Sequence, residues 1–208
     1  MPAATISRLY LGDPEQRNST AAYSQWRARH GLEPDWDIAK SDGGNADGSE
    51  LIGQAAADFE LPQVDGETFR LSEHAGKIIV LDFWATWCRP CVAALPDYVE
   101  ATRHFHESEL VFVAVNIEES PQQIRAFLKE HQLDMRVAID GGSEVASQYQ
   151  VGGIPHSLII SPEGTIEYVH VGYDPDAGSE IQRVAEAILS GNWSRDASAV
   201  QESNTSPE

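Results

Sequence analysis

The sequence predicts an α/β protein with a central mixed β-sheet and helices on both faces of that sheet. Two nearly unbroken runs of β-branched and aromatic residues, 78–84 and 110–117, have the composition of strands buried on both faces. Segments with helix start and stop signals alternate with these and with shorter strand patterns. The length of 208 residues and the 41% hydrophobic content suit one ordinary globular domain with extensions, or two small domains.

The first fifty residues differ in composition from the centre of the chain. Residues 1–40 are polar, and Asp13 followed by Pro14, with Gly31 as a stop signal, predicts a helix in this extension. Residues 41–50 are rich in Gly, Asp and Ser, which is typical of a linker. We therefore expect a partly helical N-terminal extension that is joined by a linker to the main domain.

The main domain is predicted to occupy residues 51–191, and 192–208, rich in Ser, Asn and Glu, to form a disordered tail. The chain has 14 Lys and Arg against 33 Asp and Glu, a formal charge of −19, and the main domain alone has 8 against 22. Such acidity argues against nucleic acid or anionic membrane surfaces as partners, because both attract basic proteins. The sequence contains no run of 18 apolar residues, so no direct membrane insertion of this chain is expected.

A β-hairpin is expected before the main sheet. Val64-Asp65-Gly66-Glu67 has the composition of a turn between two short strand patterns, 58–62 and 68–71. Ser72 can then cap a helical turn that ends near Gly76. These elements precede the first long buried strand.

The central elements follow from apolar runs and helix signals. After the strand 78–84, a helix is expected over about 89–106, and the strand 110–117 follows it. Ser120 and Pro121 form a cap with proline at the first helical position, which predicts a helix to about 131. The remaining expected elements are a strand at 136–139, a helix at 143–149, strands at 157–160 and 166–171 joined through Pro162-Glu163-Gly164, and a last amphipathic helix at 178–190.

The chain contains only two cysteines, and both lie in Trp87-Cys88-Arg89-Pro90-Cys91, where a buried strand leads into a helix. Two thiols at this spacing in the first helical turn can close a small disulfide ring. The helix N-terminus stabilises a thiolate at Cys88, whereas Cys91 points toward the interior. Cys88 is therefore the expected nucleophile and Cys91 the resolving thiol. The alternative is half of a zinc site, which needs two more ligands from seven scattered histidines.

The segment from Phe83 to Cys91 resembles the active-site segment of the thioredoxin superfamily. The longer pattern is similar to TlpA/ResA-like thiol–disulfide oxidoreductases, with an AhpC/TSA-redoxin type of domain, over about 53–190. The resemblance implies a thioredoxin-like fold in which the hairpin is an N-terminal extension. Its other matching motifs are Gly53-Gln54-Ala55-Ala56-Ala57-Asp58-Phe59-Glu60-Leu61, Asp65-Gly66, Gly76-Lys77 and Gly153-Ile154-Pro155.

The same resemblance implies that Pro155 is a cis-proline facing the cysteine turn and that Ile154 offers its backbone to an extended substrate strand. Without it, a proline before a strand is an ordinary edge residue. Trp87, Arg89 and Pro90 complete the expected substrate-contacting set, with Trp87 as a flat apolar surface. The Arg89 charge is also expected to lower the pKa of Cys88 slightly.

Asp82 interrupts an apolar strand six residues before Cys88 and matches the buried Asp of thioredoxins. There, burial would raise its pKa, and the carboxylate could accept the proton of Cys91. The alternative is an Asp at a strand end that faces solvent. TlpA/ResA-like proteins often carry a Glu in the helix, but here 92–96 has no acid, so Asp82 is expected to handle the proton.

Histidines near the motif are expected to be structural. We expect His156 to be a strand residue in ordinary contact with solvent, and His104 and His106 to lie on the surface near a helix end. Trp84 is expected to pack in the core below the site. No metal ligands are therefore predicted.

The predicted function is thiol–disulfide oxidoreduction, most simply the reduction of protein disulfides through a Cys88 mixed disulfide that Cys91 resolves. The expected partners are client proteins with disulfides and an upstream thiol electron donor, with no cofactor beyond the cysteine pair. One alternative is a thiol peroxidase, although Leu81 and Ala85 occupy the positions where peroxiredoxins need Pro and Thr. The other is a non-catalytic interaction module with a structural disulfide.

Family resemblance favours an extracytoplasmic location, for example the periplasm. The start of the chain lacks the basic-then-apolar layout of a secretory signal, and no membrane anchor is recognisable. A cytoplasmic location is the alternative.

Overall fold

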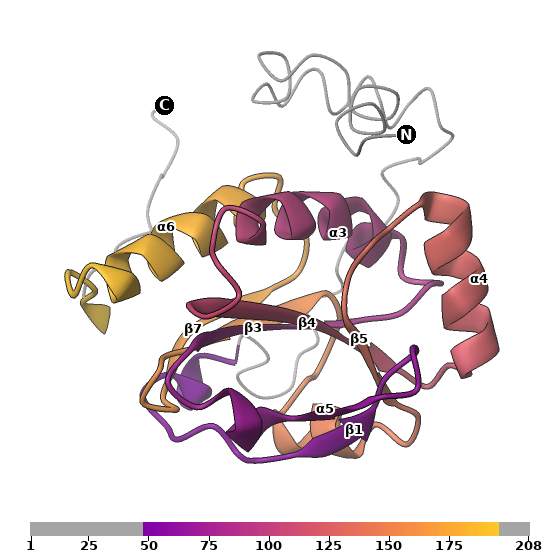
Figure 1. Cartoon of the computed structure of the whole chain (residues 1–208), viewed down its shortest axis with the longest axis horizontal. Helices are drawn as coiled ribbons and strands as arrows, with labels where there is room; N and C mark the ends of the chain where they lie inside the picture. Colours follow the sequence, from indigo (N-terminus) through magenta and orange to yellow (C-terminus); the bar gives the residue numbers. More distant parts are fainter. Residues whose placement is uncertain (1–47, 196–208) are drawn as a thin grey trace, which may run out of the picture. The chain divides into compact units, whose positions relative to one another are not determined.

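The computed structural model describes residues 48–195. Their main sheet has five strands, β3 (Ile78–Trp84), β4 (Leu110–Ile117), β5 (Val137–Asp140), β6 (His156–Ile160) and β7 (Ile166–Val171). The strand order is β5-β4-β3-β6-β7 (Figure 1). Strands β3, β4 and β5 are parallel, whereas β6 pairs antiparallel with both β3 and β7. The sheet is mixed, as the sequence predicts.

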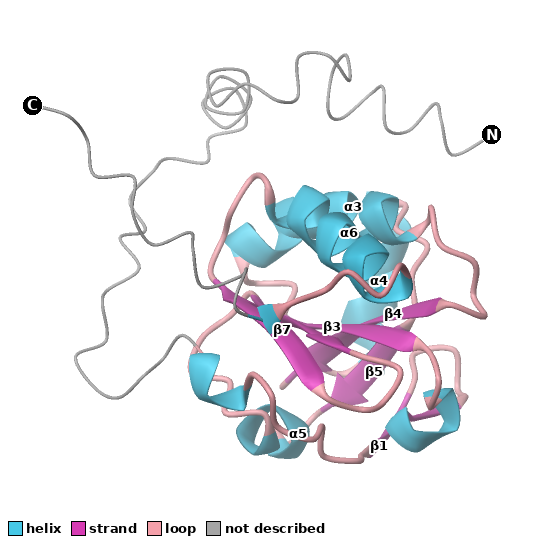
Figure 2. Cartoon of the chain, turned by 90° about the vertical axis from the view of Figure 1, so that its left-hand side faces the viewer, coloured by secondary structure: helices cyan, strands magenta, loops and turns pink. Residues whose placement is uncertain are grey.

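Helices cover both faces of this sheet. Figures 1 and 2 show α3 (Arg89–Thr102), α4 (Pro121–His131) and α6 (Ala177–Leu189) on one face of the sheet, and a short helix with the hairpin on the other. The opposite face carries α5 (Glu144–Gln148), the hairpin strands β1 (Glu60–Pro62) and β2 (Thr68–Arg70), and the 3-10 turn Leu71–His74.

Strand β3 contributes side chains to the core on each side of the sheet. All of its residues are buried, and alternate residues point to opposite faces. Ile79, Leu81 and Phe83 join the core below the hairpin and α5, whereas Ile78 and Val80 pack with α3 and α6. The alternation therefore places Asp82 on the face that α3 and α6 cover.

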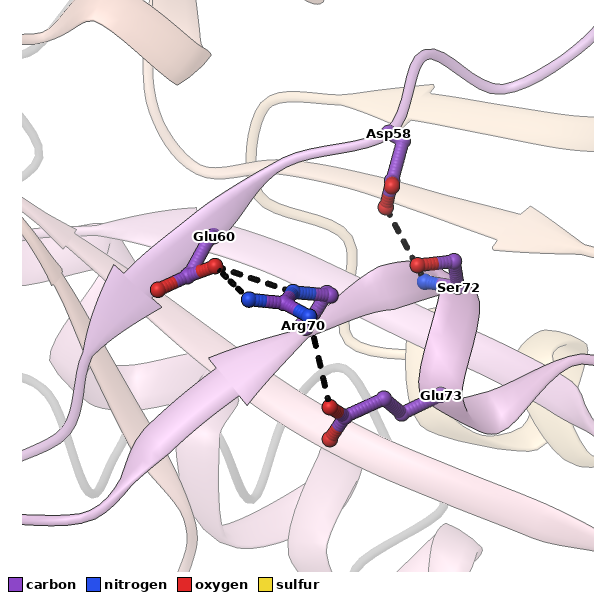
Figure 3. A network of polar contacts seen from close by, with 5 residues as sticks. All are labelled: Asp58, Glu60, Arg70, Ser72 and Glu73. Carbon is purple, nitrogen blue, oxygen red and sulfur yellow. Dashed lines mark hydrogen bonds and ion pairs between the residues drawn. The ribbon is translucent and has the colours of Figure 1, made fainter.

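The hairpin is joined on its exposed side by polar contacts (Figure 3). Arg70 of β2 donates from Nε to Glu60 of β1 at 2.9 Å and forms an ion pair with Glu73 at 3.7 Å. The Ser72 backbone N–H donates to Asp58 at 3.0 Å. Because these groups are exposed, we expect the contacts to fix the hairpin register more than to add stability.

Most expected element boundaries lie within two residues of those observed, but the helix expected over 89–106 ends earlier, at Thr102. The following turn offers competing hydrogen bonds. The His106 backbone N–H donates to Glu109 at 3.1 Å, and the Ser108 N–H donates to His106 Nδ1 at 3.1 Å. Such side-chain bonds to the backbone satisfy groups that a continued helix would otherwise use.

Both ends of the described region pack on the domain. A short 3-10 turn spans Ser49–Leu51. Trp193 Nε1 and Arg195 Nε donate to Glu167 at 3.0 and 2.7 Å, so packed structure continues four residues beyond the expected boundary at 191. The helix expected to begin near Asp13 lies outside the described residues. Within 48–195 no helix combines the length and apolarity needed to cross a bilayer.

Candidate active site

Cys88 and Cys91 form a disulfide at the point where β3 leads into α3. Their sulfurs are 2.01 Å apart, and Cys88 occupies the N-cap position of α3. The Cys91 backbone N–H donates to Cys88 Sγ at 3.2 Å, and Pro90 lies in the first turn. Helix N-termini lower thiol pKa values, because their free N–H groups and dipole favour a negative charge. The local geometry therefore favours a thiolate at Cys88 in the reduced pair.

The two sulfurs differ in access to solvent. Cys88 is 5% exposed, whereas Cys91 is fully buried in a cluster with Trp84 and Leu95. A partner sulfur can approach only the more accessible one. The nucleophilic role of Cys88 and the resolving role of Cys91 stay predictions, and this asymmetry is the observation on which they depend.

A cis peptide bond joins Ile154 to Pro155 beside this disulfide, as the family resemblance implies. The Ile154 carbonyl oxygen lies 3.7 Å from Cys88 Sγ, and Pro155 is buried. Two segments far apart in sequence, the α3 N-terminus and the loop before β6, therefore meet at the reactive sulfur.

The remaining expected contact residues surround the disulfide. Trp87 is the most exposed large apolar side chain of the described residues, at 61%. Arg89 is exposed and Pro90 is half-buried. Trp84, in contrast, is completely buried and packs against Phe127 of α4, as expected for a core residue. The site thus has an apolar, accessible rim at Trp87 above a closed core.

Asp82 is fully buried, so the alternative of a solvent-facing Asp is wrong. Ser157 Oγ donates to Asp82 Oδ1 at 2.8 Å, and Asp82 Oδ2 has no hydrogen-bond partner among the described residues. Loss of solvation raises the pKa of Asp82 to about 8, and the Ser157 bond opposes this rise. At neutral pH the carboxyl group is therefore mostly protonated and can still exchange a proton.

The active-site loop is also held by an acid that the sequence patterns did not single out. Glu119, 7% exposed, accepts from the Thr86 backbone N–H at 2.7 Å and from the Thr86 hydroxyl. It also accepts from Asn116 Nδ2 at 2.8 Å. The signal that could have identified Glu119 is its position just after β4, the parallel neighbour of β3. Loops that follow neighbouring parallel strands lie at the same edge of the sheet, here the edge that carries the cysteine pair.

The expectation that His156 contacts solvent is wrong. His156 is fully buried beside the ring of Phe83, and neither ring nitrogen has a hydrogen-bond partner among the described residues. Gly48 lies so close that a Cβ there would come within 3.2 Å of the imidazole. Burial, followed by the nearby His170, lowers the pKa of His156 to about 4. The imidazole is thus neutral at physiological pH.

The described residues contain no group of three or more His, Cys, Asp or Glu side chains placed to hold a metal ion. The two cysteine sulfurs are bonded to each other instead. The chemistry that this arrangement supports is thiol–disulfide exchange, in which an accessible thiolate attacks a disulfide sulfur through a mixed-disulfide intermediate.

Comparison with known proteins agrees with this geometry. Residues 52–169, more than half of the chain, match the AhpC/TSA family. Thiol-disulfide oxidoreductase ResA of Oceanobacillus iheyensis is 36% identical over 125 residues, which are 58% of this chain and 65% of the relative. The chain thus spans just under two thirds of that relative's length.

Solved structures show the same fold. The exposed lipoprotein thioredoxin Etrx1 of Streptococcus pneumoniae superposes with a TM-score of 0.53 and 33% identity, covering 61% of this chain and 98% of that one. A thioredoxin-family thiol:disulfide interchange protein of Chlorobium tepidum has a TM-score of 0.57 and 26% identity, covering 65% and 95%. The chain belongs to the AhpC/TSA family and, within it, to the thioredoxin-like thiol–disulfide oxidoreductases.

Proposed function

We propose that this chain reduces disulfide bonds in client proteins, with Cys88 as nucleophile and Cys91 as resolving thiol. The observation that carries the proposal is the unequal pair at the start of α3, with Cys88 at the N-cap and Cys91 buried. The N-cap position favours the Cys88 thiolate, which is the reactive form. The buried position of Cys91 protects its thiol until a mixed disulfide brings a target sulfur next to it.

The first step forms the mixed disulfide. The Cys88 thiolate attacks one sulfur of the client disulfide, the new S–S bond forms at Cys88, and the other client sulfur leaves as a thiolate. Trp87 offers an apolar surface beside the attack site. Ile154 and Pro155 support docking of an extended client segment, because Ile154 places backbone groups next to Cys88. Arg89 and Pro90 complete the contact surface.

The second step releases the client. In the molecules in which Asp82 is ionised, the minority form near neutral pH, the Cys91 thiol gives its proton to the Asp82 carboxylate. The Cys91 sulfur then attacks Cys88 Sγ to form the Cys88–Cys91 disulfide. The second client sulfur leaves as a thiolate. The client has gained two electrons and the cysteine pair has lost two, so an upstream thiol donor must reduce the pair again. This cycle needs no cofactor besides the two cysteines.

Insulin-disulfide reduction tests the proposal. Cys88→Ser should abolish reduction, and Cys91→Ser should allow at most one attack per molecule, because no resolving thiol remains. Trp87→Ala serves as a comparison that keeps both thiols and should weaken client binding only. Turnover by Cys88→Ser at the wild-type rate would overturn the assignment.

We also propose that the domain works outside the cytoplasm. The support is its similarity to an exposed lipoprotein thioredoxin of Streptococcus pneumoniae. Labelling intact cells with a thiol reagent that cannot cross membranes should modify the reduced protein. Modification only after cell lysis would place it in the cytoplasm instead.

A further inference from the structure

The helix that begins at the cysteine pair also buries a phenol. Cys91 and Tyr98 are seven residues apart in α3, so they lie on one face of that helix. Both side chains are completely buried. The residues between them on this face, Ala94 and Leu95, are buried as well. The face of α3 that positions the resolving thiol therefore carries a second polar group into the core.

Tyr98 belongs to the core layer that contains Asp82. It lies in one cluster with Val80 of β3 and Ile159 of β6, which pair with each other in register. The next pair on the same side of the sheet joins Asp82 to Ser157. Side chains two residues apart along a strand point to the same face. The phenol and the Asp82–Ser157 pair thus share the layer between the sheet and α3.

The Tyr98 hydroxyl lies close enough to this pair to interact with both of its members. Burial and then the charge of Asp82 raise the pKa of the phenol, whereas interaction with the Ser157 hydroxyl lowers it. The Tyr98 oxygen nevertheless has no complete hydrogen bond within residues 48–195. In the disulfide form of the protein the phenol is therefore next to Ser157 without being bonded to it.

Ser157 links the phenol to the carboxyl group. Its Oγ donates to Asp82 Oδ1 at 2.8 Å, which uses the single proton of the hydroxyl and leaves its lone pairs for a donor. The Tyr98 phenol can be that donor, because its raised pKa keeps its proton in place. A bond from Tyr98 would polarise the Ser157 hydroxyl and strengthen its bond to Asp82, most of all when the carboxyl group is charged.

The two oxygens of Asp82 have different surroundings. Oδ1 accepts from Ser157, whereas Oδ2 is buried and has no hydrogen-bond partner among the described residues. On the other side, Asp82 pairs with Ala114 of β4, which is buried and apolar. Because Oδ1 is held by a donor, Oδ2 is the oxygen that remains to take up a proton.

Other titratable groups near this layer come from β7 and from the loop before α6. After burial and the charge of the carboxyl group, Tyr168 and Asp174 also raise the pKa of Tyr98. His170 is opposite Ser157 in the register of β7 against β6. Burial also raises the pKa of Tyr168. Both phenols stay protonated near neutral pH and act as hydrogen-bond donors, not as charges. The α6 residues in this cluster are apolar: Ala177, Ile181, Val184 and Ala185.

We propose that the hydroxyls of Tyr98 and Ser157 hold the ionised carboxyl group of Asp82 and leave its Oδ2 free for the proton of Cys91. When Asp82 ionises, Tyr98 donates to Ser157 Oγ. Ser157 in turn donates to Asp82 Oδ1, which fixes the carboxylate. Tyr98 and Ser157 act through Asp82 and are positioning residues.

The inference rests on the proposed function, and a titration of Asp82 tests it separately. Carbon-13 NMR follows the carboxyl carbon of Asp82 across neutral pH, and Asp82→Asn assigns the signal. The protein is kept in its disulfide form, as in the structure, so that neither thiol titrates together with Asp82. Tyr98→Phe should move the midpoint of the titration up by about half a pH unit and Ser157→Ala by about one, because each removes support for the charged form.

A double variant and matched controls make the titration specific. Because Tyr98 acts through Ser157, Tyr98→Phe should have no further effect in the Ser157→Ala background. Ser157→Thr keeps the hydroxyl and should titrate like the wild type. Tyr149→Phe removes another buried phenol hydroxyl, which donates to the Ala57 carbonyl at 2.7 Å in the core below the hairpin and α5. Its midpoint should equal that of the wild type.

Closure of the Cys88–Cys91 disulfide gives the second readout. Stopped-flow tryptophan fluorescence follows closure in reduced protein mixed with saturating insulin. At neutral pH Tyr98→Phe should slow closure up to about threefold and Ser157→Ala up to about tenfold, because a smaller fraction of Asp82 is ionised. Well above the midpoint both variants should approach the wild-type rate, which a misfolded variant would not do.

The outcomes separate the two proposals. A Tyr98→Phe titration that coincides with that of the wild type would overturn the role of Tyr98 and leave disulfide reduction by Cys88 untouched. Shifted titrations with unchanged closure would also overturn the inference, because the held carboxyl group would then play no part with Cys91. Shifted titrations in a protein that does not reduce insulin would support the hold on Asp82 and overturn the proposed function.

Discussion

At the scale of single residues, the burial of Asp82 has two opposite consequences, because it makes ionisation of the carboxyl group costly and also suits the group to proton transfer. A carboxyl group that is shielded from solvent, and that has only one hydrogen bond within residues 48–195, is costly to ionise. Its folded-state pKa of about 8 lies well above the value near 3.9 of an unfolded chain. The same elevation makes the group able to accept and release a proton near neutral pH.

Asp82→Asn should change how stability depends on pH. Between pH 4 and 8 the folded wild type holds a proton on Asp82 that the unfolded chain has lost, so the free energy of unfolding falls as pH rises. For this one group, the free energy of unfolding falls by at most about 1.4 kcal/mol for each unit of pH in this range. Urea unfolding at a series of pH values should show this fall in the wild type and its absence in the variant.

Asp134→Asn is a suitable control, because Asp134 is exposed. It should follow the wild-type curve throughout. Parallel curves for Asp82→Asn and the wild type would mean that Asp82 ionises normally in the folded protein.

At the scale of elements, α3 and α6 pack closely against each other on one face of the sheet. Gly178 in the first turn of α6 lies against the backbone of Asp97 in α3. A Cβ at Gly178 would lie 2.9 Å from the Asp97 carbonyl oxygen, closer than side chains approach backbone atoms. The glycine is therefore required by packing and not by its backbone angles.

Gly178→Ala should push α6 away from α3 and lower the free energy of unfolding by about 1–3 kcal/mol. Thermal and denaturant unfolding measure this directly. Gly141→Ala is the matched control, since a Cβ at Gly141 would meet no atom within 4 Å. Equal stability of the two variants would show that α6 moves without cost.

Elements with strong local signals could be predicted from the sequence. Strands 78–84 and 110–117 are uninterrupted apolar runs, and the helix after Ser120 has its capping box with Gln123. The end of α3 could not be predicted, because it depends on side-chain bonds of the next turn, at His106.

Contacts between segments that are distant in the sequence could not be predicted from local sequence patterns. The bond of Ser157 to Asp82 depends on the antiparallel register of β6 against β3, which is a tertiary property. The burial of His156 depends on Gly48, more than a hundred residues earlier in the chain. The cysteine pair and Pro155 were predictable because their motifs are specific, whereas Glu119 and Ser157 belong to no such motif.

At the scale of the whole molecule, charge is the most unusual property. The full chain has a formal charge of −19, and the domain holds 22 acids against 8 bases. A strongly acidic surface attracts basic partners and repels acidic ones, and salt weakens both effects. Arg89 is an exposed positive charge next to the nucleophile.

Client charge should therefore affect the rate of reduction. A disulfide peptide flanked by lysines should be reduced faster than one flanked by glutamates, and the difference should shrink as ionic strength rises. Stopped-flow rates with the two peptides at low and high salt give the comparison. Equal rates at low salt would show that the acidic surface plays no part in client choice.

The central claim is that Cys88 attacks the client and Cys91 resolves the mixed disulfide. Intact-mass spectrometry of reduced variants mixed with a disulfide-containing client tests it most directly. Cys91→Ser should accumulate a covalent adduct of one client per chain, joined at Cys88 and released by dithiothreitol, whereas Cys88→Ser should form none. An adduct on Cys88→Ser but not on Cys91→Ser would reverse the two roles and contradict the mechanism.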